Sequence, residues 1–188
     1  VILFSGKFIE KKQSLLLIEA FARVRRETPC WLLMAGDGPL RQSMEDLIRH
    51  LQIPNVLLPG FLNMTELPFA YSAADIFVLP SSHLETWGLV INEAMNFSLP
   101  VVVSDKVGCA ADLVRDGWNG FIVDHQSVDA LVEALSRLMK DRELRQIFGK
   151  RSLDLVSGYS IKNCADDIVS ACLSVCRKNL QSQDRSMP

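Results

Sequence analysis

The chain has 188 residues, a formal net charge of −2, and a composition that is 48% hydrophobic and 22% charged. This composition is typical of a globular domain, and the length suits a single hydrophobic core. Because the chain is slightly acidic and has no cluster of five or more basic residues, we do not expect it to bind nucleic acid.

Five cysteines are present, an odd number without a C-x-x-C pair. This pattern predicts reduced thiols in a cytoplasmic protein and argues against a disulfide framework or a zinc site. Cys164, Cys172 and Cys176 share a four-residue spacing with Ile168, which predicts one apolar helix face. Cys109 is expected to be a small apolar filler.

The two ends of the chain differ in character. The first residues, Val1 to Phe4, form an apolar strand pattern without an initiator methionine, so we expect one domain of a longer protein. Residues 1–179 are predicted to form that domain, and residues 180–188 a disordered polar tail. No stretch of 18 consecutive apolar residues occurs, so no membrane-spanning segment is predicted.

Apolar runs and helical periodicity alternate along most of the chain. Strands are predicted at 1–4, 31–35, 56–58, 76–79, 101–103 and 120–123. Helices are predicted at 14–26, 39–51, 65–73, from 88 onward, and at 110–115, 127–140, 141–156 and 160–179, with Asp141 and Ser160 as N-caps. The strands are continuous apolar runs, which indicates a sheet covered on both faces. The predicted fold class is therefore α/β: a Rossmann-like, doubly wound parallel sheet of six strands with helices on both faces and further C-terminal helices.

The stretch after the fourth predicted strand is the main candidate for a binding site, because such sheets bind ligands at the carboxyl ends of their strands. A polar loop there carries Glu85, and a helix that begins near Gly88 contains Glu93. Glu93 could accept hydrogen bonds from two vicinal hydroxyls of a ribose. Alternatively, Asn92, Glu93 and Asn96 form a polar stripe that is simply a solvated helix face.

Two basic positions after the first strand, Lys7 and Lys12, would face the same edge of the sheet. Together with a helix N-terminus they would suit a diphosphate. The amides that could point at phosphate oxygens are those of Gly88, Leu89 and Val90.

Several common cofactor motifs are absent from the sequence. Neither G-x-G-x-x-G nor G-x-x-x-x-G-K-[ST] occurs, which argues against a nicotinamide or flavin cofactor and against a P-loop. The histidines, His50, His83 and His125, show no metal-ligand spacing. We therefore expect neither a cofactor nor a metal ion.

Seven short motifs, in this order and spacing, resemble the retaining glycosyltransferases of family 4 (group 1), which have the GT-B fold. The motifs are Gly6-Lys7 with Lys12, Ala35-Gly36-Asp37-Gly38-Pro39, Pro59-Gly60-Phe61, Ala74-Asp75 before the fourth strand, Glu85-x7-Glu93, Leu99-Pro100-Val101-Val102, and Asp116-Gly117-x-Asn119-Gly120-Phe121. Each motif alone is weak, whereas the ordered set covers nearly the whole chain.

The resemblance implies the C-terminal, donor-binding half of a two-domain enzyme. It implies a metal-independent, retaining hexosyltransferase that uses a nucleoside-diphosphate sugar, with UDP or GDP as the nucleotide, in polysaccharide or glycolipid biosynthesis. The acceptor would be held by the enzyme's own N-terminal domain, which is absent here, so the chain alone is expected to be inactive. The implied location is cytoplasmic, with peripheral membrane contact through the missing domain left open.

The resemblance also implies roles for individual residues. Lys7 and Lys12 would clamp the diphosphate, Glu85 would contact the donor sugar, and Glu93 would bind the ribose. The remaining implied donor-binding residues are Gly6, Phe61 and Leu62, the last two near the base, and Trp87, Gly88, Leu89 and Val90 around the sugar and phosphates.

Two positions depart from the family pattern. Lys7 replaces the usual arginine, which turns a bidentate clamp into a point charge. Asp112 stands where glutamate is more frequent, in a loop near the donor sugar. The alternatives to a transferase are a nucleotide-sugar epimerase or phosphorylase of GT-B architecture and a non-catalytic nucleotide-binding domain.

Overall fold

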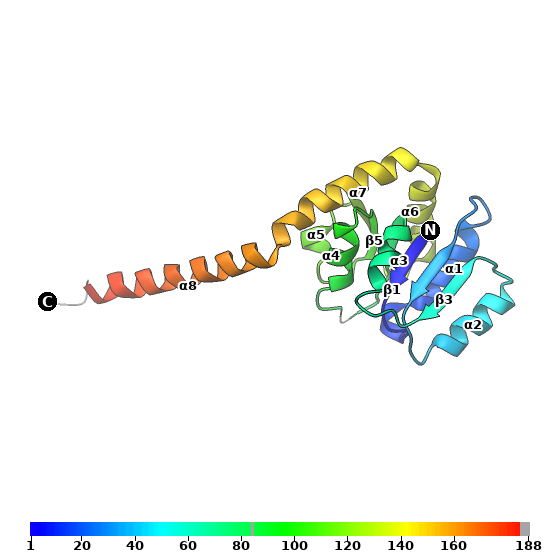
Figure 1. Ribbon diagram of the computed structural model, residues 1–188, viewed down its shortest axis with the longest axis horizontal. Coiled ribbons are helices and arrows are strands. Elements are labelled where there is room, and N and C mark those ends of the chain that lie inside the picture. Colours follow the sequence, from blue (N-terminus) through cyan, green and yellow to red (C-terminus); the bar gives the residue numbers. More distant parts are fainter. Residues whose placement is uncertain (84, 185–188) are drawn as a thin grey trace.

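A computed structural model describes residues 1–83 and 85–184 of the chain, with side chains to residue 175. Six strands form one parallel sheet in the order β3-β2-β1-β4-β5-β6 (Figure 1). The strands are β1 (Ile2–Ser5), β2 (Leu32–Ala35), β3 (Val56–Gly60), β4 (Ile76–Leu79), β5 (Val101–Ser104) and β6 (Gly120–Val123). The predicted six-stranded parallel sheet is confirmed, and each strand starts within one residue of its predicted position.

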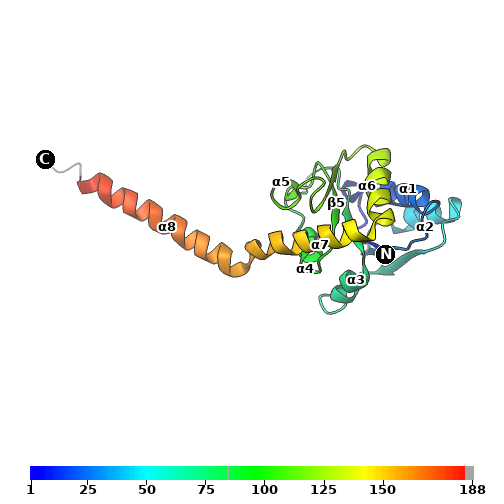
Figure 2. The ribbon, with the colours of Figure 1, turned by 90° about the horizontal axis from the view of Figure 1, so that it is seen from above.

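Helices cover both faces of the sheet, as predicted. The helices are α1 (Ser14–Val24), α2 (Arg41–His50), α3 (Leu67–Ala73), α4 (Leu89–Asn96), α5 (Ala110–Leu113), α6 (Val128–Lys140), α7 (Arg142–Val156) and α8 (Ile161–Asp184). Helices α1, α2 and α6 pack together on one face, while α4 packs with α7 on the other (Figure 2). Two short 3-10 turns, η1 (Glu10–Lys12) and η2 (Ser157–Tyr159), were not predicted.

The predicted N-caps are also confirmed. The Asp141 carboxylate accepts a hydrogen bond from the Leu144 amide at 2.8 Å. The Ser160 hydroxyl accepts one from the Asn163 amide at 3.1 Å. Each bond satisfies an amide that the first turn of a helix leaves without a partner.

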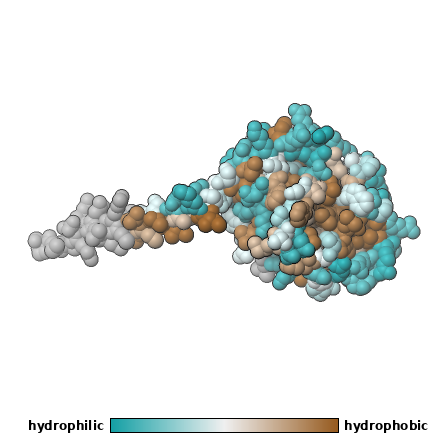
Figure 3. Space-filling view, in the orientation of Figure 1, coloured by the Kyte–Doolittle hydropathy of each residue, from teal (hydrophilic) through white to brown (hydrophobic). Residues whose placement is uncertain are grey.

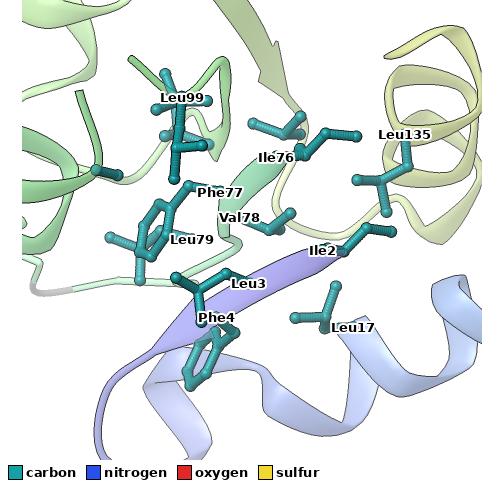
Figure 4. Packing of buried hydrophobic residues seen from close by; sticks show 14 of the residues in the cluster. Ile2, Leu3, Phe4, Leu17, Ile76, Phe77, Val78, Leu79, Leu99 and Leu135 are labelled. Atoms are coloured by element: carbon teal, nitrogen blue, oxygen red, sulfur yellow. The ribbon is translucent and has the colours of Figure 1, made fainter. Parts of the chain in front are cut away.

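The core follows the sheet because the central strands are buried along their whole length. All four residues of β1, β4 and β5 are buried. Side chains from β1 and β4 meet Leu17 of α1 and Leu135 of α6 (Figure 4). This burial on both faces explains why the strands read as unbroken apolar runs.

The sheet contains a topological switch point between two neighbouring central strands. β1 pairs with β2 on one side and with β4 on the other. The chain leaves β1 toward β2 and leaves β4 toward β5, so the two connections diverge. In open α/β sheets, this divergence opens a crevice at the carboxyl ends of the two strands.

Helix α8 extends away from the rest of the domain (Figures 1 and 2). It continues to Asp184, so residues 180–184 are helical where the sequence predicted a disordered tail, and residues 185–188 lie outside the described part. Cys164 and Cys172 are exposed on it, and the Cys176 side chain is not among those described. Its exposed apolar residues are Ile161, Ile168, Val169, Leu173 and Val175 (Figure 3). Because the helix contacts little of the domain, the predicted apolar face has no partner within the described chain.

Within residues 1–83 and 85–184, no helix combines the length and the apolarity that crossing a membrane requires.

Cys109 is fully buried, and burial raises the pKa of its thiol to about 12. The prediction that Cys109 is an apolar filler is therefore confirmed, since such a thiol stays protonated and unreactive.

Gly149 allows α7 to approach the backbone that precedes β5. A Cβ atom at this position would lie 2.0 Å from the Ser98 carbonyl oxygen. Because that neighbour is backbone and not a flexible side chain, the helix could accept a methyl group only by moving.

We expect Gly149→Ala to lower the free energy of unfolding by about 1–3 kcal/mol, the usual cost of overpacking. Helix propensity alone would instead raise it by about 1 kcal/mol. Urea denaturation measures the difference. Gly158→Ala is the matched control, because a Cβ there meets nothing within 4 Å; equal stability of the two variants would contradict the close approach.

Candidate functional site

Three loops at the carboxyl ends of β1, β2 and β3 enclose a pocket of about 520 Å³. Its lining residues are Gly6, Lys7, Ala35, Gly36, Asp37, Gly38, Phe61 and Leu62. Four predicted site residues, Gly6, Lys7, Phe61 and Leu62, are thus brought together from two separate loops. Lys7 is exposed and supplies the positive charge of the pocket, and Phe61 is 78% exposed at its edge.

An ion pair joins the segments that follow β1 and β4 at the switch point. Lys12, in η1 after β1, pairs through its Nζ with Oε2 of Glu85, in the loop after β4. Each side chain is only 12% exposed. The Ser81 hydroxyl donates to the same carboxylate oxygen at 3.1 Å. Two residues predicted for the same site therefore contact each other directly.

Backbone contacts fix the loop that carries Glu85. The Ser82 amide donates to the Lys11 carbonyl at 2.7 Å, which ties this loop to η1. On the other side, the Gly108 amide donates to the Glu85 carbonyl at 2.8 Å, and the Cys109 amide donates to the Trp87 carbonyl at 2.9 Å. The Glu85 backbone is therefore held between the loops after β1 and β5, an arrangement that preorganises its carboxylate.

Helix α4 starts at the same edge of the sheet. Its N-cap, Gly88, has a φ of +96°, a conformation that favours glycine. A Cβ atom there would also lie 3.2 Å from side-chain atoms of Leu79 and Val107. The first amides of a helix lack carbonyl partners within it, so the backbone N–H groups of Leu89 and Val90 can donate hydrogen bonds to an anion.

The Trp87 side chain contacts neighbouring helices. Its indole Nε1–H donates to Oδ1 of Asn92 in α4 at 2.8 Å. Its ring lies 6.3 Å from the ring of Tyr159 in η2, at an interplanar angle of 46°. Because the indole ring already has these partners, we expect Trp87 to contact a ligand at this edge through its backbone and not through its ring.

Glu93 is exposed on α4, as both sequence interpretations require. It is not merely solvated, because Tyr71 of α3 donates a hydrogen bond to its Oε2 at 2.7 Å. Sequence reasoning missed Tyr71, and it also missed Ser81 beside Glu85. Neither residue stands out in the sequence. Tyr71 becomes a partner of Glu93 only when α3 packs beside α4, and Ser81 lies four positions before Glu85 in the same loop.

A second polar cluster lies at the ends of β5 and β6. Asp105, Asp124 and His125 place ligand atoms within 4.8 Å of one another. Asp105 is already engaged by Lys106 Nζ at 2.7 Å and by the His125 amide and ring, each at 3.0 Å. The Lys106 ammonium, together with His125, lowers the pKa of Asp105 to about 2. Lys106 and His125 are therefore the partners of Asp105 within this cluster.

Comparison with known proteins places the chain in a family. The family model described as "Glycosyl transferases group 1" matches residues 1–154. The alpha-D-kanosaminyltransferase of Streptomyces kanamyceticus is 33% identical over 172 residues, which are 89% of this chain and 44% of that protein. The chain thus spans less than half of this relative.

Solved structures agree with the fold. HepE of Anabaena, solved in complex with UDP and glucose, superposes with a TM-score of 0.81 at 22% identity, over 92% of this chain and 48% of that one. The C-terminal domain of LpcC, a group 1 glycosyl transferase from Francisella tularensis, superposes with a TM-score of 0.79 at 25% identity, over 85% of this chain and 86% of that domain. The chain therefore belongs to the group 1 glycosyltransferases and corresponds to the C-terminal domain of their GT-B architecture.

Proposed function

We propose that the chain binds the nucleoside-diphosphate sugar of a retaining glycosyltransferase, whose acceptor is held by a further domain. The observation that carries this proposal is the Lys12–Glu85 ion pair at the switch point, beside the start of α4. The HepE structure, which contains UDP and glucose, supports a nucleotide sugar as the ligand of this chain. The transferase relatives and the Glu-x7-Glu spacing favour glycosyl transfer over epimerase or phosphorylase chemistry.

In this proposal the diphosphate lies between Lys7, Lys12 and the first turn of α4. An ammonium group has three donors, so Lys12 can keep its bond to Glu85 and also bind a phosphate oxygen. When the bond between the sugar and the phosphate breaks, negative charge develops on the leaving diphosphate. Two lysines and the helix amides would stabilise that charge, which makes a metal ion unnecessary in this scheme.

Glu85 would contact the donor sugar. Both Lys12 and Ser81 bond to Oε2, so we assign Oε1 to the sugar hydroxyls and to the positive charge that develops at the anomeric carbon. Retention requires the acceptor oxygen to attack from the face that the diphosphate leaves. The further domain would therefore have to hold the acceptor facing the carboxyl ends of the strands. Phe61 and Leu62 would contact the base of the nucleotide, and Glu93 would contact its ribose.

The first expected outcome is nucleotide binding without transfer. Isothermal calorimetry of this chain with UDP, GDP and ADP should show at least one Kd below about 1 mM. Incubation with the matching nucleotide sugar and an acceptor should yield no transfer product. Absence of binding by all three nucleotides would remove the basis of the proposal.

Lys7→Ala tests where the diphosphate lies in the same titration. It should weaken binding of the nucleoside diphosphate about tenfold, since hydrogen bonds to charged groups contribute roughly 1.5–3 kcal/mol. It should leave binding of the corresponding nucleoside unchanged. Lys150→Ala, an exposed lysine on α7, is the control and should alter neither affinity.

A separate expectation concerns Glu85 in the two-domain enzyme. Glu85→Gln should lower kcat by about 10²-fold, the magnitude typical of a lost electrostatic contact to the transition state. The affinity for the nucleoside diphosphate should not decrease, because the substitution leaves Lys12 available to phosphate. Steady-state kinetics together with calorimetry separates the two effects, and an unchanged kcat would exclude Glu85 from the reaction.

A further inference from the structure

Tyr71 connects the buried core to the exposed carboxylate of Glu93. Its phenolic O–H donates to Glu93 Oε2 at 2.7 Å, from α3 to α4. Tyr71 is only 2% exposed, whereas Glu93 is exposed. The bond therefore anchors a surface carboxylate to a group that cannot move freely.

The Tyr71 ring is held by aromatic neighbours. It stacks on Phe97, at the end of α4, with centroids 5.3 Å apart and an interplanar angle of 21°. It also packs against Phe77 of β4 at 5.8 Å and 45°. These separations fall in the range of favourable aromatic pairs, so the position of the hydroxyl is fixed relative to both β4 and α4.

The chemistry of Tyr71 suits a permanent donor. Burial, followed by the neighbouring Glu93 carboxylate, raises the pKa of Tyr71 far above its ordinary value, and a hydrogen bond from Ser5 offsets this only in part. Ser5 is the last residue of β1, so the switch-point strand also contacts this group. The phenol therefore stays protonated near neutral pH and can donate to Glu93.

A glutamate on an exposed helix face would otherwise sample many rotamers. Fixing such a side chain costs conformational entropy. The bond to Tyr71 meets this cost during folding, before any ligand arrives. Because only Oε2 is engaged by Tyr71, Oε1 and the remaining lone pairs of Oε2 can accept from a ligand.

We propose that Tyr71 is a positioning residue that presents the Glu93 carboxylate to the vicinal hydroxyls of the nucleotide ribose. The inference rests on the proposed function, in which Glu93 binds the ribose. It adds that the affinity for ribose depends on the hydroxyl of a buried tyrosine that itself touches no ligand.

The test combines Tyr71→Phe with removal of the ribose hydroxyls from the ligand. Calorimetry compares UDP with 2′,3′-dideoxyuridine diphosphate, or the equivalent pair for the base that this chain prefers. For the unaltered chain we expect UDP to bind about tenfold more tightly than the dideoxy analogue. For Tyr71→Phe we expect this ratio to fall to about twofold, with the affinity for the analogue unchanged.

Two further variants keep the result interpretable. Ser72→Ala removes an exposed hydroxyl from the same helix and should leave the ratio at its original value. In a Glu93→Gln background, adding Tyr71→Phe should change the ratio no further, because the tyrosine acts only through the carboxylate.

The possible failures are distinguishable. If the unaltered chain binds no nucleotide, or binds UDP and the analogue equally, the ribose role of Glu93 and this inference both fail. If the unaltered chain discriminates and Tyr71→Phe discriminates equally well, the proposed function stands and the positioning role is wrong. Equal weakening of both ligands by Tyr71→Phe would show that the tyrosine supports only the fold.

Discussion

The divergence of the chain at β1 and β4 is the constraint on which the rest of the site depends. Because these neighbouring strands send their connections in opposite directions, η1 and the loop after β4 meet at the carboxyl ends of the two strands. Lys12 and Glu85 lie on those two segments and neutralise each other in a largely buried setting. The pair also ties the two segments to each other, together with the backbone hydrogen bond from Ser82 to Lys11.

The two glutamates of the Glu-x7-Glu motif have different environments, which suits different roles. Glu85 is held by a cation and a hydroxyl and is mostly buried. Glu93 is exposed and has a neutral phenol as its partner. A carboxylate beside an ammonium is placed to act together with a bound phosphate, whereas one beside a phenol is placed to accept hydroxyl groups. In the proposed function, Glu85 and Glu93 therefore make two separate contacts to one ligand and do not form an acid–base couple.

Most of the fold could be predicted from the sequence because its strands are buried on both faces and are punctuated by glycine and proline. The end of α8 could not be predicted in this way. Its last described turns, near Asp184, are polar, and polarity alone does not distinguish a solvated helix from a disordered tail. The turn η1 was also missed, since three residues such as Glu10–Lys12 carry no periodicity.

The gathering of the candidate loops at one edge of the sheet was predictable, because topology places the carboxyl ends of parallel strands together. The individual pairings were not predictable. Lys12 and Glu85 are 73 positions apart, and Tyr71 and Glu93 are 22 apart on different helices, so only packing brings them into contact.

The most direct test is a crystal structure of this chain with the nucleoside diphosphate that it binds most tightly. We expect the diphosphate at the start of α4, within hydrogen-bond distance of Lys7 and Lys12, and the ribose hydroxyls on Glu93 Oε1 with the Tyr71 bond intact. A nucleotide bound away from the carboxyl ends of β1 and β4, or one whose ribose does not contact Glu93, would contradict the proposed function.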